Sequence, residues 1–542
     1  MKILAVIPAR GGSKGIPRKN LRLLNGRPLI YYSIQTALTS KYNIDVYVSS
    51  EDEEILHSAI QFGAKTHQRD ISIADDKTTL DPVIYECYQY AKKIENKEYD
   101  FIVTMQPTSP LLKISSLDSA IEKAILNKNI ETVIAAKDDT HLSWRKEGNQ
   151  FLPNYEKRVN RQFLTPTFTE TGGFFITRKD IISENSRIGG NVELHLLSQG
   201  EEIDIDTYEE WNICEYHLKR KHILFVVTGN NIVGLGHVYN TLILANDILN
   251  HKITFLVDKN SQMAYEKISS KNYPVFLQKN NNITVDIKNI KPDVIINDKL
   301  DTSSEYMDDL VRLNIKTINF EDLGEGSKKA DLVVNAIYPE KQVLQNHYFG
   351  HHYFVLRDEF IYSKKKENIN EVKNILITFG GVDPNNYTKK VIDVIYNYCH
   401  KNKIKIKIIA GFGYNFYESL EEYKDIKIED NIANISKYML EADLIFTSAG
   451  RTTYEIASIG TPTIVLAQNE RELTHFFASS EFGFLNLGLG YNIQNEVLYE
   501  NFIELLNSKD NRRYMSDLMK KNDLKSGRKR VIKHIKNLLE NI

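Results

Sequence analysis

Short apolar runs, each followed by a stretch with helical spacing, recur along the chain. In the first 220 residues they cover residues 3–7, 44–48, 101–105, 132–136 and 172–177. Strands that alternate with helices predict βαβ units in a mainly parallel sheet, and unbroken apolar runs are typical of strands buried on both faces. Such sheets bind ligands beyond the carboxyl ends of their strands. The pattern therefore predicts an α/β fold whose binding sites lie in the loops that follow the apolar runs.

A second series of the same kind follows a helical pattern over residues 207–221. Its apolar runs begin with residues 222–227 and continue at residues 374–384, 404–410, 444–450 and 463–466. The charged segment 363–371 separates this series into two halves. Two Rossmann-like halves that face each other across a cleft form the GT-B arrangement, which is used on nucleotide sugars. We therefore predict three domains, at residues 1–220, 221–365 and 366–542.

Composition narrows the class of protein but does not identify a site. Lys and Arg number 69 against 71 Asp and Glu, so no overall field favours a nucleic acid or a membrane. The basic stretch 525–536 carries apolar residues at helical spacing, which predicts a packed helix with a solvated face. The three cysteines are too far apart for a disulfide framework, and we find neither a signal peptide nor an apolar stretch of membrane-spanning length. We expect a cytoplasmic protein without nucleic-acid or membrane partners.

The loop after the first apolar run combines glycines with cations. Gly11, Gly12 and Gly15 allow backbone N–H groups to converge on an anion. The cations beside them, enough for a triphosphate, are Arg10, Lys14, Arg18 and Lys19. The spacing matches neither the P-loop nor the dinucleotide-binding fingerprint. On spacing alone, a glycine turn with a solvated basic flank explains the loop equally well.

The order of residue types in this loop is more specific than the spacing of its glycines and cations. Residues 9–20, Ala-Arg-Gly-Gly-Ser-Lys-Gly-Ile-Pro-Arg-Lys-Asn, resemble the signature of the CMP-sialic acid synthetases, cytidylyltransferases that activate nonulosonic acids. Further segments similar to that family lie at residues 69–76, 106–110, 161–162, 172–176 and 203–207. The resemblance implies a Rossmann-like nucleotidyltransferase domain that transfers CMP from CTP to a nonulosonic acid and releases diphosphate. It also implies dimerisation through this domain.

The resemblance assigns roles to individual residues. Asp204 and Asp206 would ligate Mg²⁺, and carboxylates at positions i and i+2 of an extended segment, about 7 Å apart, can share one hard cation. Taken alone, Asp-Ile-Asp is more often the end of a surface strand. The residues assigned to CTP are Arg10, Gly11, Gly12, Ser13, Lys14, Lys19, Asn20 and Arg69, with Arg10 and Lys19 also catalytic. Those assigned to the acid are Gln106, Thr108, Ser109, Arg161 and Gln162.

The second region has its own glycine-rich turn, which ends in Gly234-Leu-Gly-His237. An isolated Gly-His pair is more often a helix-start cap. Together with residues 353–360, 380–384 and 448–455, however, the turn resembles the UDP-sugar hydrolase of pseudaminic acid biosynthesis, a relative of the MurG glycosyltransferases. The resemblance implies that His237 is the base that activates water and that Gly236 faces the substrate. The residues assigned to the nucleotide are Gly380, Gly381, Ser448, Ala449, Gly450, Thr452, Thr453 and Glu455.

We therefore predict a bifunctional enzyme of nonulosonic acid biosynthesis, whose partners are CTP, a nonulosonic acid and a UDP-amino sugar. Two alternatives remain for the second region. It could be a glycosyltransferase, which needs an acceptor, or a nucleotide-sugar-binding module without catalysis. Asn240 stands where the hydrolases carry an arginine, so the identity of the UDP-sugar stays open.

Overall fold

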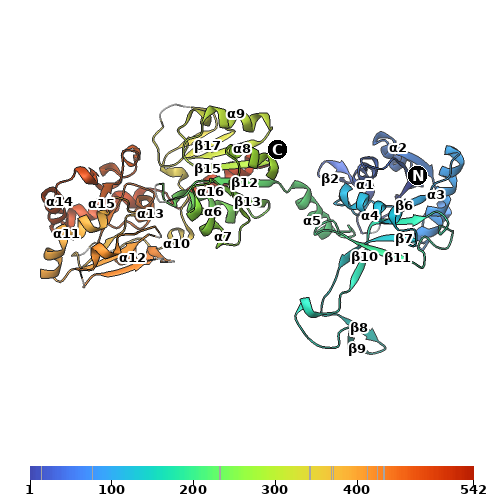
Figure 1. Cartoon of the computed structure of the whole chain (residues 1–542), viewed down its shortest axis with the longest axis horizontal. Coiled ribbons are helices and arrows are strands. Elements are labelled where there is room, and N and C mark those ends of the chain that lie inside the picture. Colours follow the sequence, from blue (N-terminus) through green and yellow to red (C-terminus); the bar gives the residue numbers. More distant parts are fainter. Residues whose placement is uncertain are drawn as a thin grey trace. The chain divides into compact units, whose positions relative to one another are not determined.

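The chain folds into two compact units, Met1–Arg220 and Lys221–Ile542 (Figure 1). The computed structural model describes residues 1–541 apart from positions 14, 76, 231–232, 341–343, 368, 370, 412, 424, 431 and 433. Each unit has sheets and cores of its own, and we describe them separately.

One seven-stranded sheet forms the first unit, in the order β11-β7-β10-β6-β1-β4-β5. Its pairs are parallel except those of β10, which runs antiparallel to β6 and β7. The strands are β1 (Ile3–Pro8), β4 (Ile44–Ser50), β5 (Lys65–Gln68), β6 (Phe101–Thr104), β7 (Thr132–Asp138), β10 (Phe168–Arg178) and β11 (Val192–Leu196). The helices are α1 (Leu29–Leu38), α2 (Glu53–Gln61), α3 (Leu80–Glu95), α4 (Ile114–Leu126) and α5 (Tyr208–Lys219).

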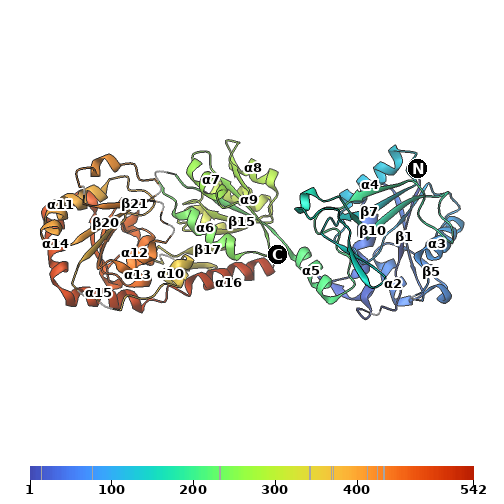
Figure 2. The same ribbon diagram turned by 90° about the horizontal axis from the view of Figure 1, so that it is seen from below.

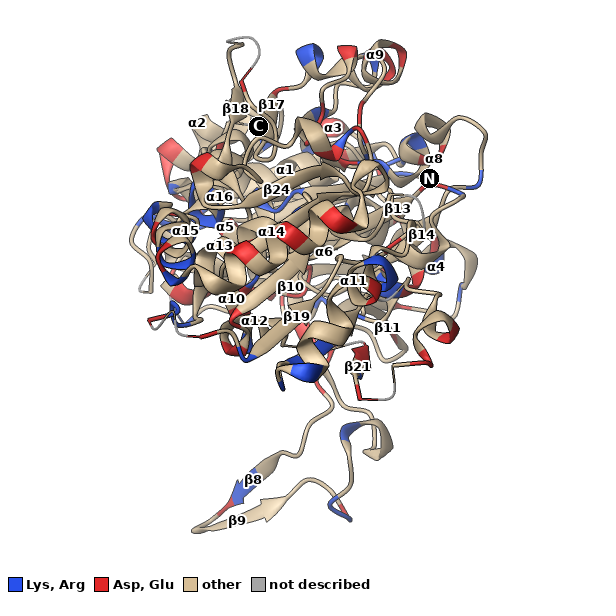
Figure 3. Ribbon diagram, turned by 90° about the vertical axis from the view of Figure 1, so that its left-hand side faces the viewer, with Lys and Arg blue, Asp and Glu red and all other residues tan. Residues whose placement is uncertain are grey.

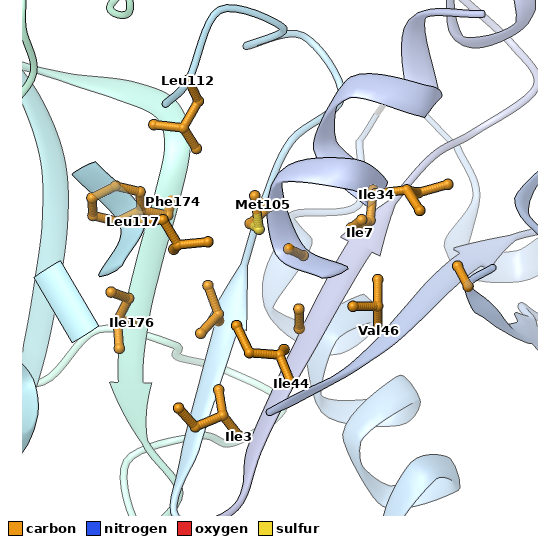
Figure 4. Packing of buried hydrophobic residues seen from close by; sticks show 14 of the residues in the cluster. Ile3, Ile7, Ile34, Ile44, Val46, Met105, Leu112, Leu117, Phe174 and Ile176 are labelled. Carbon is orange, nitrogen blue, oxygen red and sulfur yellow. The ribbon is translucent and has the colours of Figure 1, made fainter. Parts of the chain in front are cut away.

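Strand β1 is buried along its whole length because helices cover both faces of the sheet. Ile7 packs with α1 and α4 on one face, whereas Val6 packs with α3 on the other. Figure 4 shows Ile34 of α1 and Leu117 of α4 in the first of these clusters. Each fully buried aliphatic side chain of this kind stabilises the fold by about 1.5–3 kcal/mol. The strand is thus a fixed base for the loop that begins after Pro8.

Residues 139–167 leave this sheet between β7 and β10 and form an arm (Figure 1). Its only regular structure within the described residues is a short antiparallel hairpin, β8 (Trp144–Glu147) and β9 (Gln150–Pro153), and a turn of 3₁₀ helix at Arg161–Phe163. Trp144, Phe151 and Phe163 are all exposed on the arm.

The second unit contains two parallel sheets. The first has the order β14-β13-β12-β15-β16-β17-β18 and the second β21-β20-β19-β22-β23-β24. The first half comprises β12 (His222–Val227), α6 (Gly236–Asp247), β13 (Lys252–Val257), α7 (Gln262–Ser269), β14 (Val275–Leu277), α8 (Ile283–Ile290), β15 (Val294–Asp298), α9 (Ser304–Arg312), β16 (Lys316–Phe320), β17 (Leu332–Asn335), β18 (His347–Phe349) and α10 (Asp358–Ile361). The second comprises β19 (Asn374–Ile377), α11 (Tyr387–Lys401), β20 (Lys405–Ala410), β21 (Lys427–Asp430), α12 (Ile435–Glu441), β22 (Leu444–Thr447), α13 (Thr452–Ile459), β23 (Thr463–Ala467), β24 (Leu485–Leu489), α14 (Asn495–Asn507) and α15 (Lys509–Lys521).

The last helix, α16 (Gly527–Glu540), follows the second half in sequence but packs on the first (Figure 2). Its buried residues Val531, Ile535 and Leu539 belong to the core cluster of the first sheet. Arg528 near its start forms ion pairs with Asp247 of α6 and with Asp358 of α10. The predicted packed helix is therefore present, and it ties the two halves of this unit together.

The topology confirms the expected α/β class: a nucleotidyltransferase-type sheet is followed by a GT-B-type pair of Rossmann-like sheets. Figure 3 shows cationic and anionic residues interspersed along the ribbon, which agrees with the near balance of charges in the sequence. Among the described residues, no helix is both long and apolar enough to cross a membrane.

Candidate functional site

In the first unit, the predicted phosphate loop meets the loop after β4 at the carboxyl edge of the sheet. The backbone N–H of Gly11 donates to Oε1 of Glu51 (2.7 Å), and the guanidinium of Arg69 donates to Oε2 (2.9 Å). Two residues predicted to bind CTP thus hold a protein carboxylate. Gly12 has open space where a Cβ would stand. Asn20 donates to the carbonyl oxygen of Arg10 (2.9 Å) and so braces the loop.

Lys19 connects this loop to the Asp-Ile-Asp segment near the end of the unit. Its Nζ donates to the carbonyl oxygen of Ile205 (2.7 Å) and to Oδ1 of Asp206 (3.0 Å). Gly15 has to be a glycine here, because a Cβ would lie 2.5 Å from the carbonyl oxygen of Asp206. The fold therefore brings together two predicted groups that lie 187 positions apart in sequence. Of the loop's other predicted cations, Arg18 is ion-paired with Asp52 and Glu54, and Lys14 is outside the described residues.

The two aspartates lie in different surroundings. Asp206 is exposed, whereas Oδ1 of Asp204 is buried and has no hydrogen-bond partner among the described residues. Burial raises the pKa of Asp204 above its ordinary value, and the charge of Asp206 adds to this. The Thr108 side chain and the charge of Lys19 act in the opposite direction on this pKa. Gly172 leaves room for the Asp204 side chain, since a Cβ on residue 172 would lie 3.3 Å from each carboxylate oxygen of Asp204. A buried carboxylate oxygen suits a hard divalent cation.

The described residues contain no cluster of three or more acidic, histidine or cysteine side chains with metal-site geometry. A cation at Asp204 would therefore complete its coordination with phosphate oxygens or water, as Mg²⁺ commonly does. Ser109 faces the same spot. Its buried Oγ has no partner among the described residues, and a Cβ on Gly172 would lie 3.1 Å from it.

The residues assigned to the acid divide into two groups. The carbonyl oxygen of Thr108 accepts the N–H of Ile205 (2.8 Å), and the N–H of Gln106 donates to the carbonyl oxygen of Gly172 (3.1 Å), so this segment lies beside Asp204. Arg161 and Gln162 instead lie exposed on the arm, and Arg161 comes within 3.9 Å of Asp138. In the sheet, Asp138 of β7 is opposite Phe168 of β10. Phe168 is four residues before Gly172, so the two are roughly 13 Å apart along the strand. These two residues are thus not assembled with the rest within the unit.

In the second unit, a cleft of about 850 Å³ lies between the two sheets. Five of the predicted residues line it, namely Gly236, Gly380, Gly381, Thr452 and Glu455. Ser448, Ala449 and Thr453 are buried beneath its surface. Among the described lining residues, the cations are Lys267, Lys271, Arg357, Arg451 and Arg528, and the acidic ones are Asp358 and Glu455. This excess of positive charge suits a diphosphate.

His237 is the second residue of α6, and its side chain makes a hydrogen bond that the sequence did not predict. Its Nδ1 contacts Oδ1 of Asp298, which is fully buried at the end of β15. Because a carboxylate only accepts, Nδ1 carries the proton and Nε2 is left as the basic nitrogen. Two polar residues, Asn297 and Asp298, directly follow the apolar run 294–296, and this was the signal in the sequence that could have found the pair.

Three further residues surround this pair. Asn240 donates to Oδ2 of Asp298 (2.6 Å), and Arg451 of the second half donates to Oδ1 of Asn240 (2.9 Å). Arg451 also approaches Oε1 of Glu321 at 3.4 Å. A guanidinium from the second half thus contacts the side chain at position 240.

Glu321 makes stability depend on pH. Burial raises its pKa from 4.5 to about 7, so its contribution to stability is full below pH 4.5 and is lost as the pH rises through about 7. We expect Glu321→Gln to stabilise the protein by up to about 3 kcal/mol above pH 7 and by little at pH 4.5. Calorimetric unfolding of both proteins at pH 5 and pH 8 measures this, and an equal difference at the two pH values would contradict it.

Comparison with known proteins places the first part of the chain among the cytidylyltransferases. The cytidylyltransferase family model matches residues 4–158. A pseudaminic acid cytidylyltransferase of Campylobacter jejuni is 33% identical over 41% of this chain and 98% of its own length. A protein of Helicobacter pylori described as pseudaminic acid cytidylyltransferase and UDP-2,4-diacetamido-2,4,6-trideoxy-beta-L-altropyranose hydrolase is 24% identical over 86% of this chain and 88% of its own length.

An uncharacterised protein of Methanocaldococcus jannaschii, MJ1062, is 35% identical over 46% of this chain. The present chain spans 56% of the length of that relative. The Campylobacter enzyme, in contrast, is matched over nearly its whole length. The chain belongs to the cytidylyltransferase family.

Proposed function

We propose that the chain is a bifunctional enzyme of nonulosonic acid biosynthesis. The first unit transfers CMP from CTP to a nonulosonic acid of the pseudaminic class, and the second hydrolyses a UDP-amino sugar. Similarity to the Helicobacter protein, which extends over 86% of this chain, supports the combination of the two activities.

In the first reaction, the anomeric hydroxyl oxygen of the acid attacks the α-phosphorus of CTP. The bond to the diphosphate breaks, and the hydroxyl proton is lost to the surroundings. The observation that supports this site best is the buried, unpartnered Oδ1 of Asp204, which lies across from the Lys19–Asp206 contact. Asp204 would hold Mg²⁺, which supplies charge neutralisation at the phosphates. Lys19 and Arg10 would neutralise the leaving diphosphate.

In the second reaction, a water oxygen attacks the anomeric carbon of the UDP-sugar. The bond from that carbon to the UDP oxygen breaks, and the water proton passes to His237. The hydrogen bond of His237 Nδ1 to the buried Asp298 supports this role, because it orients the ring and stabilises the imidazolium that forms.

One experiment tests both activities. The protein is incubated with CTP, Mg²⁺ and each candidate acid, and the CMP-sugar is identified by mass. It is separately incubated with UDP-amino sugars in the absence of an acceptor. UDP release in the second incubation identifies a hydrolase, whereas release only after an acceptor is added identifies a glycosyltransferase. Binding without turnover identifies a nucleotide-sugar sensor.

We also propose that the protein forms a homodimer through the first unit and works in the cytoplasm, where CTP is available. The exposed aromatic residues of the arm, Trp144, Phe151 and Phe163, support a protein partner for it, since such residues are enriched at interfaces. A partner would also explain why Arg161 and Gln162 are placed away from Asp204 in their own subunit.

We expect residues 1–220 alone to fold and to form CMP-sugar at a rate close to that of the full chain. The reason is that this unit has its own sheet and core. Turnover of the fragment and of the full chain at equal concentration checks this. A folded but inactive fragment would show that the second unit contributes to the first site.

A further inference from the structure

The side chain of Arg451 crosses from the second half of the second unit to the first. Arg451 precedes α13, whose residues Thr452 and Glu455 line the cleft. Its Nη2 donates to Asn240 of α6, 211 positions away, and its Nη1 approaches Glu321. Its guanidinium also lies over the ring of Phe354 at 4.5 Å. The loop assigned to the nucleotide is thereby in contact with the helix that carries His237.

The hydrogen bonds form a directed chain that ends at this histidine. Arginine can only donate, so the amide of Asn240 has to present Oδ1 to Arg451 and Nδ2 to Asp298. Oδ2 of Asp298 is then occupied, and its Oδ1 accepts from Nδ1 of His237. Asn240 is 2% exposed, so no bulk water can replace a lost partner of its Oδ1.

The charge of Arg451 is a second reason for its position beside the first half. Asp298 and Glu321 are both buried, and their side chains are 0% and 2% exposed. Two buried carboxylates need a cation nearby, and Arg451 provides it from the other half. The fourth titratable group around His237 is His475, whose pKa burial lowers to about 4 and whose Nδ1 donates to the carbonyl oxygen of Ala449. His475 is therefore neutral and cannot replace Arg451.

Gly236 is shaped to this side chain. A Cβ at Gly236 would lie 3.1 Å from Cδ of Arg451. The glycine before His237, which we expected to admit the substrate, thus admits the arginine of the other half. Its backbone φ is not positive, so an alanine can adopt the same conformation.

We propose that Arg451 is a positioning residue for His237. Arg451 acts on His237 through Asn240 and Asp298, so the orientation of the base depends on closure of the two halves. The inference rests on the proposed hydrolysis. Separation of the two halves would break this chain of hydrogen bonds, and water would be activated only while the halves are closed.

A double-mutant cycle separates this role from direct contact of Arg451 with the diphosphate. At saturating UDP-sugar, we expect Arg451→Gln and Asn240→Ala each to lower turnover about 10–100-fold. The double variant should be no slower than the slower single variant, because both break the same chain. Losses that multiply in the double variant would overturn the proposal. Gly236→Ala should lower turnover in the wild type and have no effect in Arg451→Gln.

A second readout does not require turnover. In protein labelled with ¹⁵N-histidine, the proton on Nδ1 of His237 should give a strongly deshielded NMR signal, which is assigned by its absence in His237→Asn. We expect that signal to shift or vanish in Arg451→Gln and Asn240→Ala and to stay in Arg471→Gln, a matched control whose guanidinium also crosses between the halves, to Asp301 and Tyr338. An unchanged signal in Arg451→Gln would overturn the proposal. If the signal responds but no UDP-sugar is hydrolysed, the positioning chain stands and the proposed hydrolysis is wrong.

Discussion

Replacement of His237 by asparagine is expected to lower the hydrolysis of a UDP-amino sugar by about 10²–10⁴-fold, the usual contribution of a general base. Asparagine has no counterpart of Nε2 and cannot accept a proton from water, whereas its Nδ2 can still donate to Asp298 in place of Nδ1. The nucleotide should still bind, since the cations of the cleft are unchanged. The loss should therefore appear in kcat, with CMP transfer by the first unit unaffected. Initial rates and calorimetric binding of UDP measure the two effects.

His400→Asn is the matched control. Its side chain is 65% exposed on the second half, where its ion-pair partner is Asp425 and not Asp298. It should hydrolyse the sugar at the wild-type rate. If His237→Asn also retains that rate, His237 is a helix-start cap and not a base.

The second large effect concerns the first unit. Asp204→Asn should lower CMP transfer about 10³-fold or more, because a neutral amide loses most of the attraction of a carboxylate for a divalent cation, worth several kcal/mol at the transition state. The same change should leave the unfolding temperature equal or higher. Oδ1 of Asp204 is buried without a partner among the described residues, and removal of an uncompensated charge relieves its desolvation. Rates at saturating Mg²⁺ and a thermal scan without metal measure the two effects.

Asp100→Asn provides the comparison for this variant. Asp100 precedes β6 at the amino end of the sheet and is half exposed, so its loss should change neither the rate nor its dependence on Mg²⁺. A wild-type transfer rate in Asp204→Asn would remove Asp204 from the site. A strongly lowered unfolding temperature would show that the carboxylate stabilises the fold instead.

The strands of the fold could be read from the sequence because they are buried on both faces. Residues 3–7 and 222–227 have no polar alternation, and they lie in β1 and β12, which are interior strands of their sheets. The packing of α16 could not be read in the same way. Its apolar spacing predicts a helix, but spacing does not say which of two sheets will cover that face.

The sequence predicts only those parts of the site whose residues are neighbours along the chain. The glycines and cations after β1 form one loop, and resemblance could place roles on it. His237 contacts Asp298, which is 61 positions away in sequence. Asn240 contacts Arg451, which is 211 positions away. Such contacts form only when distant segments fold against each other, and no short sequence pattern predicts them. Glu51 was missed for a similar reason, since only the fold brings β4 next to the loop.

The course of α16 has a consequence for how the protein is made. α10 ends at Ile361 and α16 begins at Gly527, so roughly 165 residues are synthesised between them, which takes about 10–30 s at 5–20 residues per second. Until then, the apolar surface that Val531 and Ile535 cover is open to water on the nascent chain. The second half is itself complete only after α15, which ends at Lys521, so both halves are completed at nearly the same time. We expect a chaperone to bind the first half during this interval.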